Sequence, residues 1–305
     1  MNFDRFFTSP PPATGWILSS GQCVVVHRTA TEEIHCAAED CPDGAFDVGP
    51  VGLQSLDAET VAPVLARLKG AAEGARTAAV IVPTGWLRSY LIDIERPPRR
   101  EEELHDVVRW RLKKLLPVPP ADLRLSVVRL AEIEEQRRLL VLAGIERAMA
   151  SIEACFRSIG VEVGLITTRL FALVPRGADA MQSTLVIQSE GRFLSLLLLS
   201  NGVPRLLRTK PLAASDDSTG PVLREIAITS GFIRDSVGVD GEIGVRLSCE
   251  DPGLDERMRE WLHQQDGFVP IAEASHPPCG PTTVVDRLGA AQVDPGLAVV
   301  TGALR

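Results

Sequence analysis

The stretch TLVIQSEGRFLSLLLLSNGV, residues 184–203, is the part of the sequence that decides the fold. Residues 184–190 and 193–200 are rich in Leu, Val and Ile, as strands are, and Gly191 marks the turn between them. Asn201-Gly202 is a strong signal for a tight hairpin turn into a third strand. We therefore predict three consecutive strands in this half of the chain.

A similar strand–turn–strand pattern occurs near residues 16–26. A chain of 305 residues exceeds the size of one ordinary core, so the repeated pattern predicts two similar lobes. The first lobe is interrupted after Arg96-Pro97-Pro98, where a helix, two strands and a second helix are expected. The expected division is a Pro-rich lead-in at 1–14, a first lobe at 15–95 and 161–183, an inserted subdomain at 96–160, and a second lobe at 184–305.

Two helices are predicted with clear boundaries. Asp57 caps one that runs through Lys69, with apolar residues at helical spacing. The other covers residues 101–116, carries one apolar stripe and is stopped by Pro117. Trp110 falls on the polar face of this second helix, either as part of an interface or covered by a neighbouring loop or strand.

The composition is that of a globular protein, with 45% hydrophobic residues and a mean hydropathy of +0.10. The net charge of −8 argues against nucleic acid or an anionic membrane as the main partner. The longest apolar stretch, residues 193–199, is shorter than the about 20 residues of a membrane span, and residues 1–12 contain no secretory signal. The six cysteines include no C-x-x-C pair, which favours reduced thiols and a cytoplasmic location.

Four stretches of the chain share their order and spacing with one protein family. They are residues 77–83 with 91–94, residues 101–119, residues 141–161, and residues 296–305. From about Ala13 to Arg305 the chain resembles the PilM family, actin-like cytoplasmic proteins of type IV pilus assembly, and more distantly FtsA and GspL. The resemblance implies an α/β fold of the two-lobed actin-like (ribonuclease H-like) ATPase type, with a small inserted α/β subdomain.

The turns that would hold a nucleotide in this fold carry unsuitable residues. In the first loop, Ile17 occupies the position where the family has Asp, and Ser19 a position where it has Gly; Gly21 follows. In the second loop, Gln188 occupies the position of the family's Asp and Glu190 the position of its Gly. An ATP site needs Asp for the metal or its water, and Gly so that backbone N–H groups approach phosphates. These loops, including Gly191, therefore predict no bound nucleotide or metal.

The third nucleotide loop corresponds to Cys249, Glu250 and Asp251. If Glu190 and Glu250-Asp251 face one cleft, they should repel each other, and replacing Glu190 and Glu250 by Gly should raise the melting temperature or leave it unchanged. No sequence motif for catalysis or metal binding occurs, so we expect no enzymatic activity and no catalytic residue. A nucleotide-switched scaffold that binds ATP weakly, and a sugar-kinase-like phosphotransferase, stay open as alternatives.

The resemblance also implies a partner, the N-terminal cytoplasmic peptide of a bitopic PilN-like inner-membrane protein. That peptide would lie in a groove between the first lobe and the inserted subdomain, bordered by Pro83, Trp86, Arg109 and Trp110. The expected function is a non-catalytic scaffold of a type IV pilus or related secretion platform. The protein would reach the inner membrane only through its partners, bind no nucleic acid, and have self-association as an open possibility.

The basic residues at the end of the predicted helix 101–116 have an interpretation that needs no binding partner. Arg109, Arg111, Lys113 and Lys114 lie in its last turns, where cations interact favourably with the helix dipole. The separate patch of Arg96, Arg99 and Arg100 could meet an acidic partner or the inner leaflet, or form a solvated loop.

Overall fold

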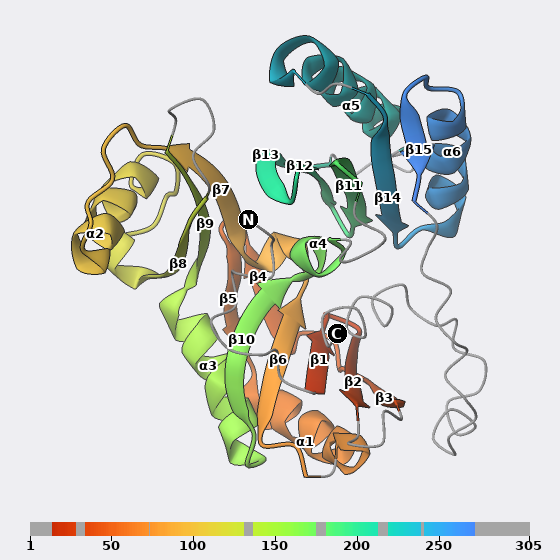
Figure 1. The fold of residues 1–305 in the computed structure, drawn as a ribbon. Helices are drawn as coiled ribbons and strands as arrows, with labels where there is room; N and C mark the ends of the chain where they lie inside the picture. The colour runs from red at the N-terminus through yellow and green to blue at the C-terminus, as the bar shows by residue number, and fades with distance from the viewer. Residues whose placement is uncertain are drawn as a thin grey trace.

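The computed structural model describes residues 14–28, 34–72, 74–130, 137–174, 181–212, 219–238 and 241–271. Figure 1 shows two lobes, one above the other, and a smaller subdomain that projects from the side of the lower lobe. The sequence also favours two closing helices, at 286–292 and 296–304; these ranges and residues 1–13 of the predicted lead-in lie outside the described residues. No helix in the described ranges has the length and apolar character needed to span a membrane.

The first lobe is built on a five-stranded sheet with the order β10-β6-β1-β2-β3. Its strands are β1 (Thr14–Leu18), β2 (Gln22–Arg28), β3 (Ile34–Asp40), β6 (Thr77–Val82) and β10 (Glu162–Thr168). β1, β2 and β3 are antiparallel, whereas β6 and β10 run parallel to β1. Alternate strand residues such as Trp16, Val25 and Val80 enter one core with α1 (Ala58–Leu68) and α3 (Glu146–Ser158).

The second lobe repeats this arrangement in its sheet of order β13-β12-β11-β14-β15. Its elements are β11 (Ser183–Glu190), β12 (Phe193–Ser200), β13 (Val203–Pro211), α5 (Thr219–Phe232), β14 (Ile243–Cys249), α6 (Pro252–His263) and β15 (Phe268–Pro270). β11 to β13 are antiparallel, and β14 and β15 run parallel to β11. Asn201 and Gly202 both have positive φ, as the tight turn requires. The predicted duplication is therefore confirmed in strand order and direction.

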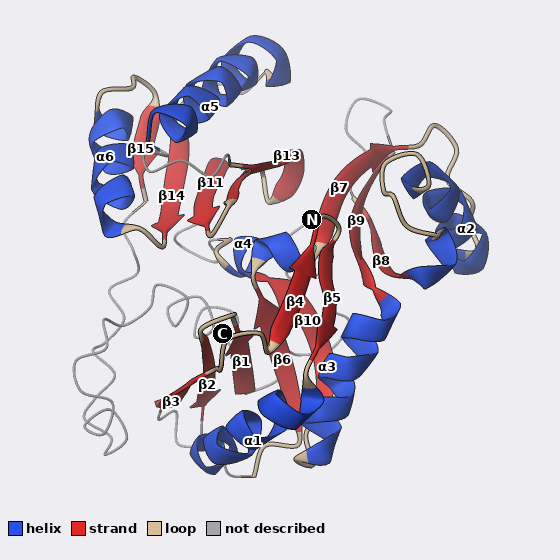
Figure 2. Ribbon diagram, turned by 180° about the vertical axis from the view of Figure 1, so that it is seen from behind, coloured by secondary structure: helices blue, strands red, loops and turns tan. Residues whose placement is uncertain are grey.

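The inserted subdomain has a three-stranded antiparallel sheet and one helix, α2. Its strands are β7 (Arg88–Asp93), β8 (Leu123–Arg129) and β9 (Arg138–Ile145), in the order β7-β9-β8. α2 (Glu101–Leu112) buries Leu104, Val108 and Leu112, so the predicted apolar stripe is confirmed. The helix ends four residues before the predicted end, and residues 113–115 continue as turns. Figure 2 shows α2 on the outer side of the subdomain sheet.

Besides β10, two elements were not predicted from the sequence. One is the short hairpin of β4 (Phe46–Gly49) and β5 (Gly52–Leu56), which packs beside α3 and β9. The other is α4 (Arg169–Ala172), a single helical turn that lies between the two lobes in Figures 1 and 2.

An apolar core joins the two lobes around α4. The buried residues of this interlobe apolar core come from both sheets and from α4, and include Ile17, Ile81, Leu170, Phe171, Val186 and Leu197. Because each sheet contributes side chains to one continuous cluster, the lobes contact each other along their inner faces rather than only through the connecting chain.

Candidate functional site

Glu190, at the end of β11 in the second lobe, is hydrogen-bonded to the first lobe. Glu190 is 7% exposed and accepts a hydrogen bond from the backbone N–H of Thr84 at 2.7 Å. It also accepts one from Nε2 of Gln188 at 3.2 Å. Thr84 begins a 3₁₀ turn, Thr84–Trp86, directly after β6. A side chain of the second lobe is thus held by a backbone donor of the first.

The Thr84 hydroxyl extends this connection. It donates to Oε1 of Gln188 at 2.6 Å and accepts from the backbone N–H of Leu170 at 3.2 Å. All three residues are buried. Because buried hydroxyl and amide groups need hydrogen-bond partners, this chain of contacts satisfies polar atoms that the lobe junction would otherwise isolate.

Arg169, the first residue of α4, lies between two carboxylates of the second lobe. Its guanidinium is 3.1 Å from Oε1 of Glu190 and 3.3 Å from Oε1 of Glu250. Its side chain is only 10% exposed. Glu250 also accepts a hydrogen bond from the backbone N–H of Gly191 at 2.7 Å. One cation therefore compensates two acids, which are further stabilised by backbone donors.

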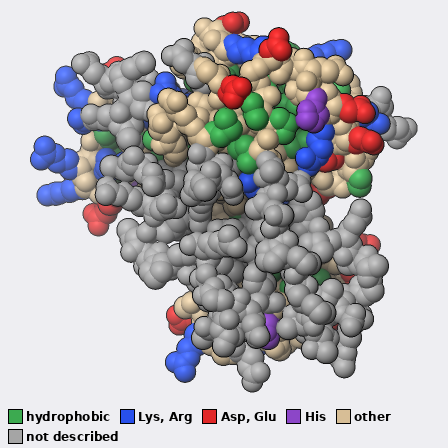
Figure 3. All heavy atoms as spheres, turned by 45° about the vertical axis from the view of Figure 1, so that its right-hand side comes forward, with side chains coloured by type: hydrophobic (Ala, Val, Ile, Leu, Met, Phe, Trp, Pro, Cys, Tyr) green, Lys and Arg blue, Asp and Glu red, His purple; other side chains and the backbone are tan. Residues whose placement is uncertain are grey.

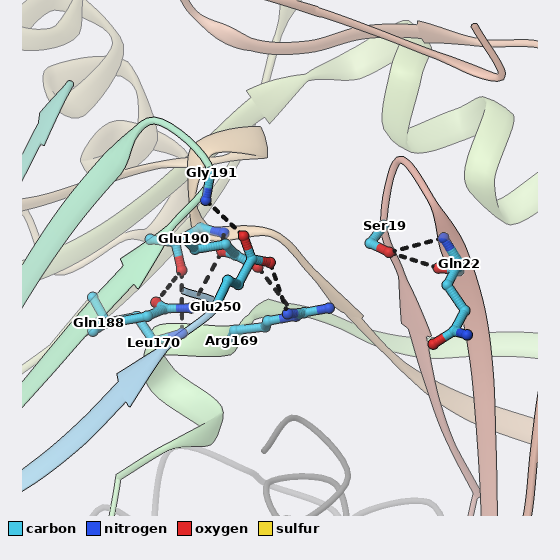
Figure 4. A network of polar contacts seen from close by, with 9 residues as sticks. Ser19, Gln22, Arg169, Leu170, Gln188, Glu190, Gly191 and Glu250 are labelled. Carbon is cyan, nitrogen blue, oxygen red and sulfur yellow. Dashed lines mark hydrogen bonds and ion pairs between the residues drawn. The ribbon is translucent and has the colours of Figure 1, made fainter. Parts of the chain in front are cut away.

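We call Thr84, Arg169, Gln188, Glu190 and Glu250 the interlobe polar cluster. Figure 4 shows Arg169 pointing toward the two glutamates, opposite the turn that contains Ser19. The sequence predicted that Glu190 and Glu250 would repel each other if they faced one cleft; in the structure both contact the same guanidinium, which compensates such repulsion.

The first loop is a closed turn. The Ser19 hydroxyl donates to the carbonyl of Gln22 at 2.7 Å and accepts from its N–H at 3.2 Å, and the Ser19 N–H donates to the same carbonyl. Ile17 is 1% exposed and belongs to the interlobe apolar core. Gly21 is exposed, and its carbonyl accepts from the N–H of Cys41. The loop thus directs an apolar side chain to the junction, and its Ser19 donors are already used.

The third loop is the start of a helix. Asp251 is the N-cap of α6 and accepts from the backbone N–H groups of Gly253 and Leu254 at 2.8 and 3.1 Å. Pro252 occupies the first helical turn, where its missing N–H costs little. Cys249 is buried at the end of β14, and burial raises the pKa of its thiol. Asp251 therefore has a structural role that the sequence did not indicate.

An aromatic contact lies beside the polar cluster. The ring of Phe193 in the second lobe packs on Gly85, where a Cβ atom would be 2.4 Å from the ring. The guanidinium of Arg88 lies 5.3 Å from the centre of the same ring. Gly85 is therefore required by this close approach between the lobes.

The residues predicted to border a peptide groove have different surroundings. Trp86 is 3% exposed and packs on Phe46, with ring centres 4.6 Å apart. Arg109 donates from Nη1 to the carbonyls of Pro120 and Leu123 at 3.1 and 3.0 Å. Trp110 is 58% exposed, so the alternative that a neighbouring loop or strand covers it is wrong. Trp86 therefore offers no open aromatic surface beside Trp110.

The carbonyl of Pro83, the fourth predicted groove residue, accepts from the N–H of Trp86 at 2.9 Å. This bond closes the 3₁₀ turn that positions Thr84 and Gly85.

A cavity of about 230 Å³ lies between the inserted subdomain and the first lobe. Its walls come from β8, β9, α3 and β10, and are formed by Leu87, residues 124–126 and 142–144, Met149, Glu153 and residues 163–166. Arg124 forms ion pairs with Glu153 and, at 2.5 Å, with Glu146. The hydrogen bond from Arg124 to Glu146 holds the pKa of the Glu146 carboxyl below its usual value. The cavity therefore combines apolar walls with a paired charge.

Sequence reasoning missed Arg169 and Thr84. Arg169 is the single charged residue in the range 163–175, and an isolated charge in an apolar stretch indicates a buried cation that needs an acidic partner. Thr84 gives no comparable signal, because its partner Gln188 is 104 positions away. Within the described part of the chain, no group of three or more His, Cys, Asp or Glu side chains is placed to hold a metal ion.

This architecture is also found in proteins of known structure. No protein-family model and no curated protein matches the chain. Among solved structures, a chain of a PilM–PilN type IV pilus biogenesis complex aligns with a TM-score of 0.71 and 17% identity, over 97% of this chain and 100% of that one.

Two further structures align less closely. The ethanolamine utilization protein EutJ from Carboxydothermus hydrogenoformans has a TM-score of 0.50 and 12% identity, over 97% of this chain and 90% of that one. A protein of unknown function with an actin-like ATPase fold, from Bacteroides thetaiotaomicron, has a TM-score of 0.50 and 7% identity, over 88% and 93%. With the duplicated five-stranded sheets, these likenesses show that the chain has the actin-like ATPase fold.

Proposed function

We propose that this protein is a non-catalytic scaffold of a type IV pilus or related secretion platform. Its partner would be the N-terminal cytoplasmic peptide of a bitopic PilN-like inner-membrane protein, which would hold the scaffold at the membrane. The supporting observation is the likeness, over 97% of this chain, to a structure of a PilM–PilN complex.

The cavity between the subdomain and the first lobe is the proposed peptide site. β8 is an edge strand of the subdomain sheet and β10 is an edge strand of the first-lobe sheet, and both line the cavity. An edge strand offers backbone hydrogen bonds to an added extended peptide, and a pocket beside it accepts alternate side chains. The site therefore suits a short extended segment.

We further infer that the scaffold works without ATP. The interlobe polar cluster joins the lobes where nucleotide phosphates would be expected, and it carries two carboxylates and one guanidinium. A phosphate near Glu190 would meet like charge, at a cost of a few kcal/mol at ~5 Å and an effective dielectric near 20. The cluster and Ile17 together support a non-catalytic role.

A binding measurement tests the peptide site. The probe is a fluorescently labelled N-terminal cytoplasmic peptide of a bitopic PilN-like protein from the same organism, and binding is followed by anisotropy. Ser126→Arg places a long side chain in the cavity from an exposed position on β8, and we expect at least a tenfold loss of affinity. Ser55→Arg, at an exposed position on β5 outside the cavity, is the matched control and should bind normally.

Two tryptophan variants separate the cavity from the groove expected from the sequence. Trp110→Ala should leave peptide affinity unchanged, because Trp110 does not line the cavity. Trp86→Ala should lower stability, because the side chain is buried. A loss of affinity in Trp110→Ala with normal binding by Ser126→Arg would move the peptide to the outer face of α2.

A further inference from the structure

Cations gather at the C-terminal end of α2 in a protein that is acidic as a whole. Residues 107–121 contain Arg109, Arg111, Lys113 and Lys114 and no Asp or Glu, whereas the net charge of the chain is −8. Arg109 is used internally, on the carbonyls of Pro120 and Leu123. The other three are exposed and form no ion pair with any residue in the described ranges.

Two large apolar side chains are exposed at the same place. Trp110 is 58% and Leu115 57% exposed, and only three other large hydrophobic residues in the described ranges reach comparable exposure. The Lys114 ammonium lies over the Trp110 ring, 4.7 Å from its centre. Interaction with the helix dipole accounts for cations in the last turn, but it does not require an exposed Trp and Leu.

We propose that Trp110, Arg111, Lys113, Lys114 and Leu115, here called the α2 basic–aromatic end, bind an anionic phospholipid surface. Trp is favoured at the boundary between lipid headgroups and acyl chains, and basic side chains around it attract anionic lipids. The partner chemistry thus follows from the charge and from the exposed aromatic ring.

The shape of the subdomain favours a lipid surface over a protein segment. α2 is the outermost element of the subdomain in Figures 1 and 2, so an extended flat surface can reach its end. In Figure 3, Lys and Arg side chains project at the left-hand edge of the molecule, the side on which α2 lies in Figure 1. A protruding helix end suits a planar partner, whereas bound peptides usually lie in grooves.

This contact is separate from the proposed peptide site, because none of its five residues lines the cavity. Direct lipid binding would add to attachment through a membrane-protein partner, and would orient the inserted subdomain toward the bilayer. Two weak attachments acting together hold a protein more firmly than either alone.

The test uses the full chain and vesicles without any protein partner. Sedimentation with phosphatidylglycerol–phosphatidylcholine vesicles should show binding that declines with salt, and pure phosphatidylcholine vesicles should show none. Lys113→Glu with Lys114→Glu should weaken binding tenfold or more, since each basic residue near the surface contributes about fivefold. Arg224→Glu with Arg257→Glu, exposed positions on α5 and α6, makes the same change in net charge and should bind normally.

Tryptophan fluorescence gives a second readout. Of the four tryptophans, Trp16 and Trp86 are buried and Trp261 is half-buried on α6, so the part of an emission shift on vesicles that is lost in Trp110→Phe comes from Trp110. Absence of vesicle binding, or equal losses in the two double variants, would overturn the proposal. Normal peptide affinity in the Lys113 and Lys114 variant would show that the protein is folded and that the proposed peptide site is independent.

Discussion

Arg169 is the cation of the interlobe polar cluster. Its guanidinium contacts Glu190 and Glu250 while being nearly excluded from solvent. Removing one partner of a buried ion pair leaves an uncompensated charge, which typically destabilises a protein by about 3 kcal/mol or more. The cluster is therefore sensitive to single substitutions, although an ion cluster need not stabilise more than an apolar junction would.

Arg169→Met should lower the free energy of unfolding by about 3 kcal/mol, because two carboxylates then share the junction without a cation. Urea unfolding followed by circular dichroism measures the change. The matched control is Arg100→Met, since Arg100 is 82% exposed and pairs with Glu103 at 3.7 Å, a surface pair worth about 1 kcal/mol at most. Equal effects of the two substitutions would contradict the role given to Arg169.

Replacing Glu190 and Glu250 together by Gly should lower the melting temperature, in contrast to the expectation from the sequence. The double variant removes the acceptor for the Thr84 N–H and leaves Arg169 without its two acids. Differential scanning calorimetry decides between the two expectations. A rise in melting temperature would restore the view that these acids repel each other.

His27 should make stability depend on pH. Burial, and then the neighbouring His35, hold the pKa of His27 below its usual 6.5, and its Nδ1 lies 2.8 Å from the Thr14 hydroxyl. The unfolded chain therefore binds the proton more readily than the folded one, so stability falls as pH drops below about 6.5. In His27→Gln, the free energy of unfolding should depend less on pH between about pH 7 and pH 5. His263→Gln, at an exposed position, is the control and should keep the wild-type slope.

At the scale of elements, the Thr84–Trp86 turn of the first lobe lies against the start of β12 in the second. Gly85→Ala would place a methyl group against the Phe193 ring. Overpacking of this kind costs about 2 kcal/mol, so we expect a lower melting temperature with normal secondary structure. Gly70→Ala is the control, since no atom lies within 4 Å of its added Cβ, and it should not destabilise.

Elements with strong local patterns were predictable from the sequence. The strands around Gly191 and Asn201-Gly202 were found, as was α1, whose N-cap Asp57 accepts from the N–H of Glu59. The β4–β5 hairpin was missed because its strands have four and five residues, too few for a clear alternation. α4 was missed because a four-residue helix has no periodicity.

The candidate site was less predictable than the fold, for a physical reason. Thr84 and Glu190 are 106 positions apart, and Arg169 and Glu250 are 81 apart. Such partners meet only once both lobes are folded and joined, so no local pattern links them. The sequence did indicate that the loops lack the residues of a nucleotide site, but not that a guanidinium lies between their acids.

At the scale of the whole molecule, we expect no appreciable MgATP binding. The interlobe polar cluster and the interlobe apolar core join the lobes at the expected nucleotide position, and Glu190 and Glu250 place negative charge there. Isothermal titration calorimetry at millimolar MgATP should give no heat beyond dilution. A dissociation constant in the low micromolar range would contradict the proposed ATP-independent role.

The sharing of one guanidinium by Glu190 and Glu250 also restricts the mutational routes open to this gene. Glu190→Gly alone would remove one acid and an acceptor, whereas Gln188→Asp alone would add a third carboxylate to the junction. Each single step should therefore lower the free energy of unfolding. The junction therefore constrains single substitutions at these positions, and a phosphate site at this place would require several coordinated substitutions.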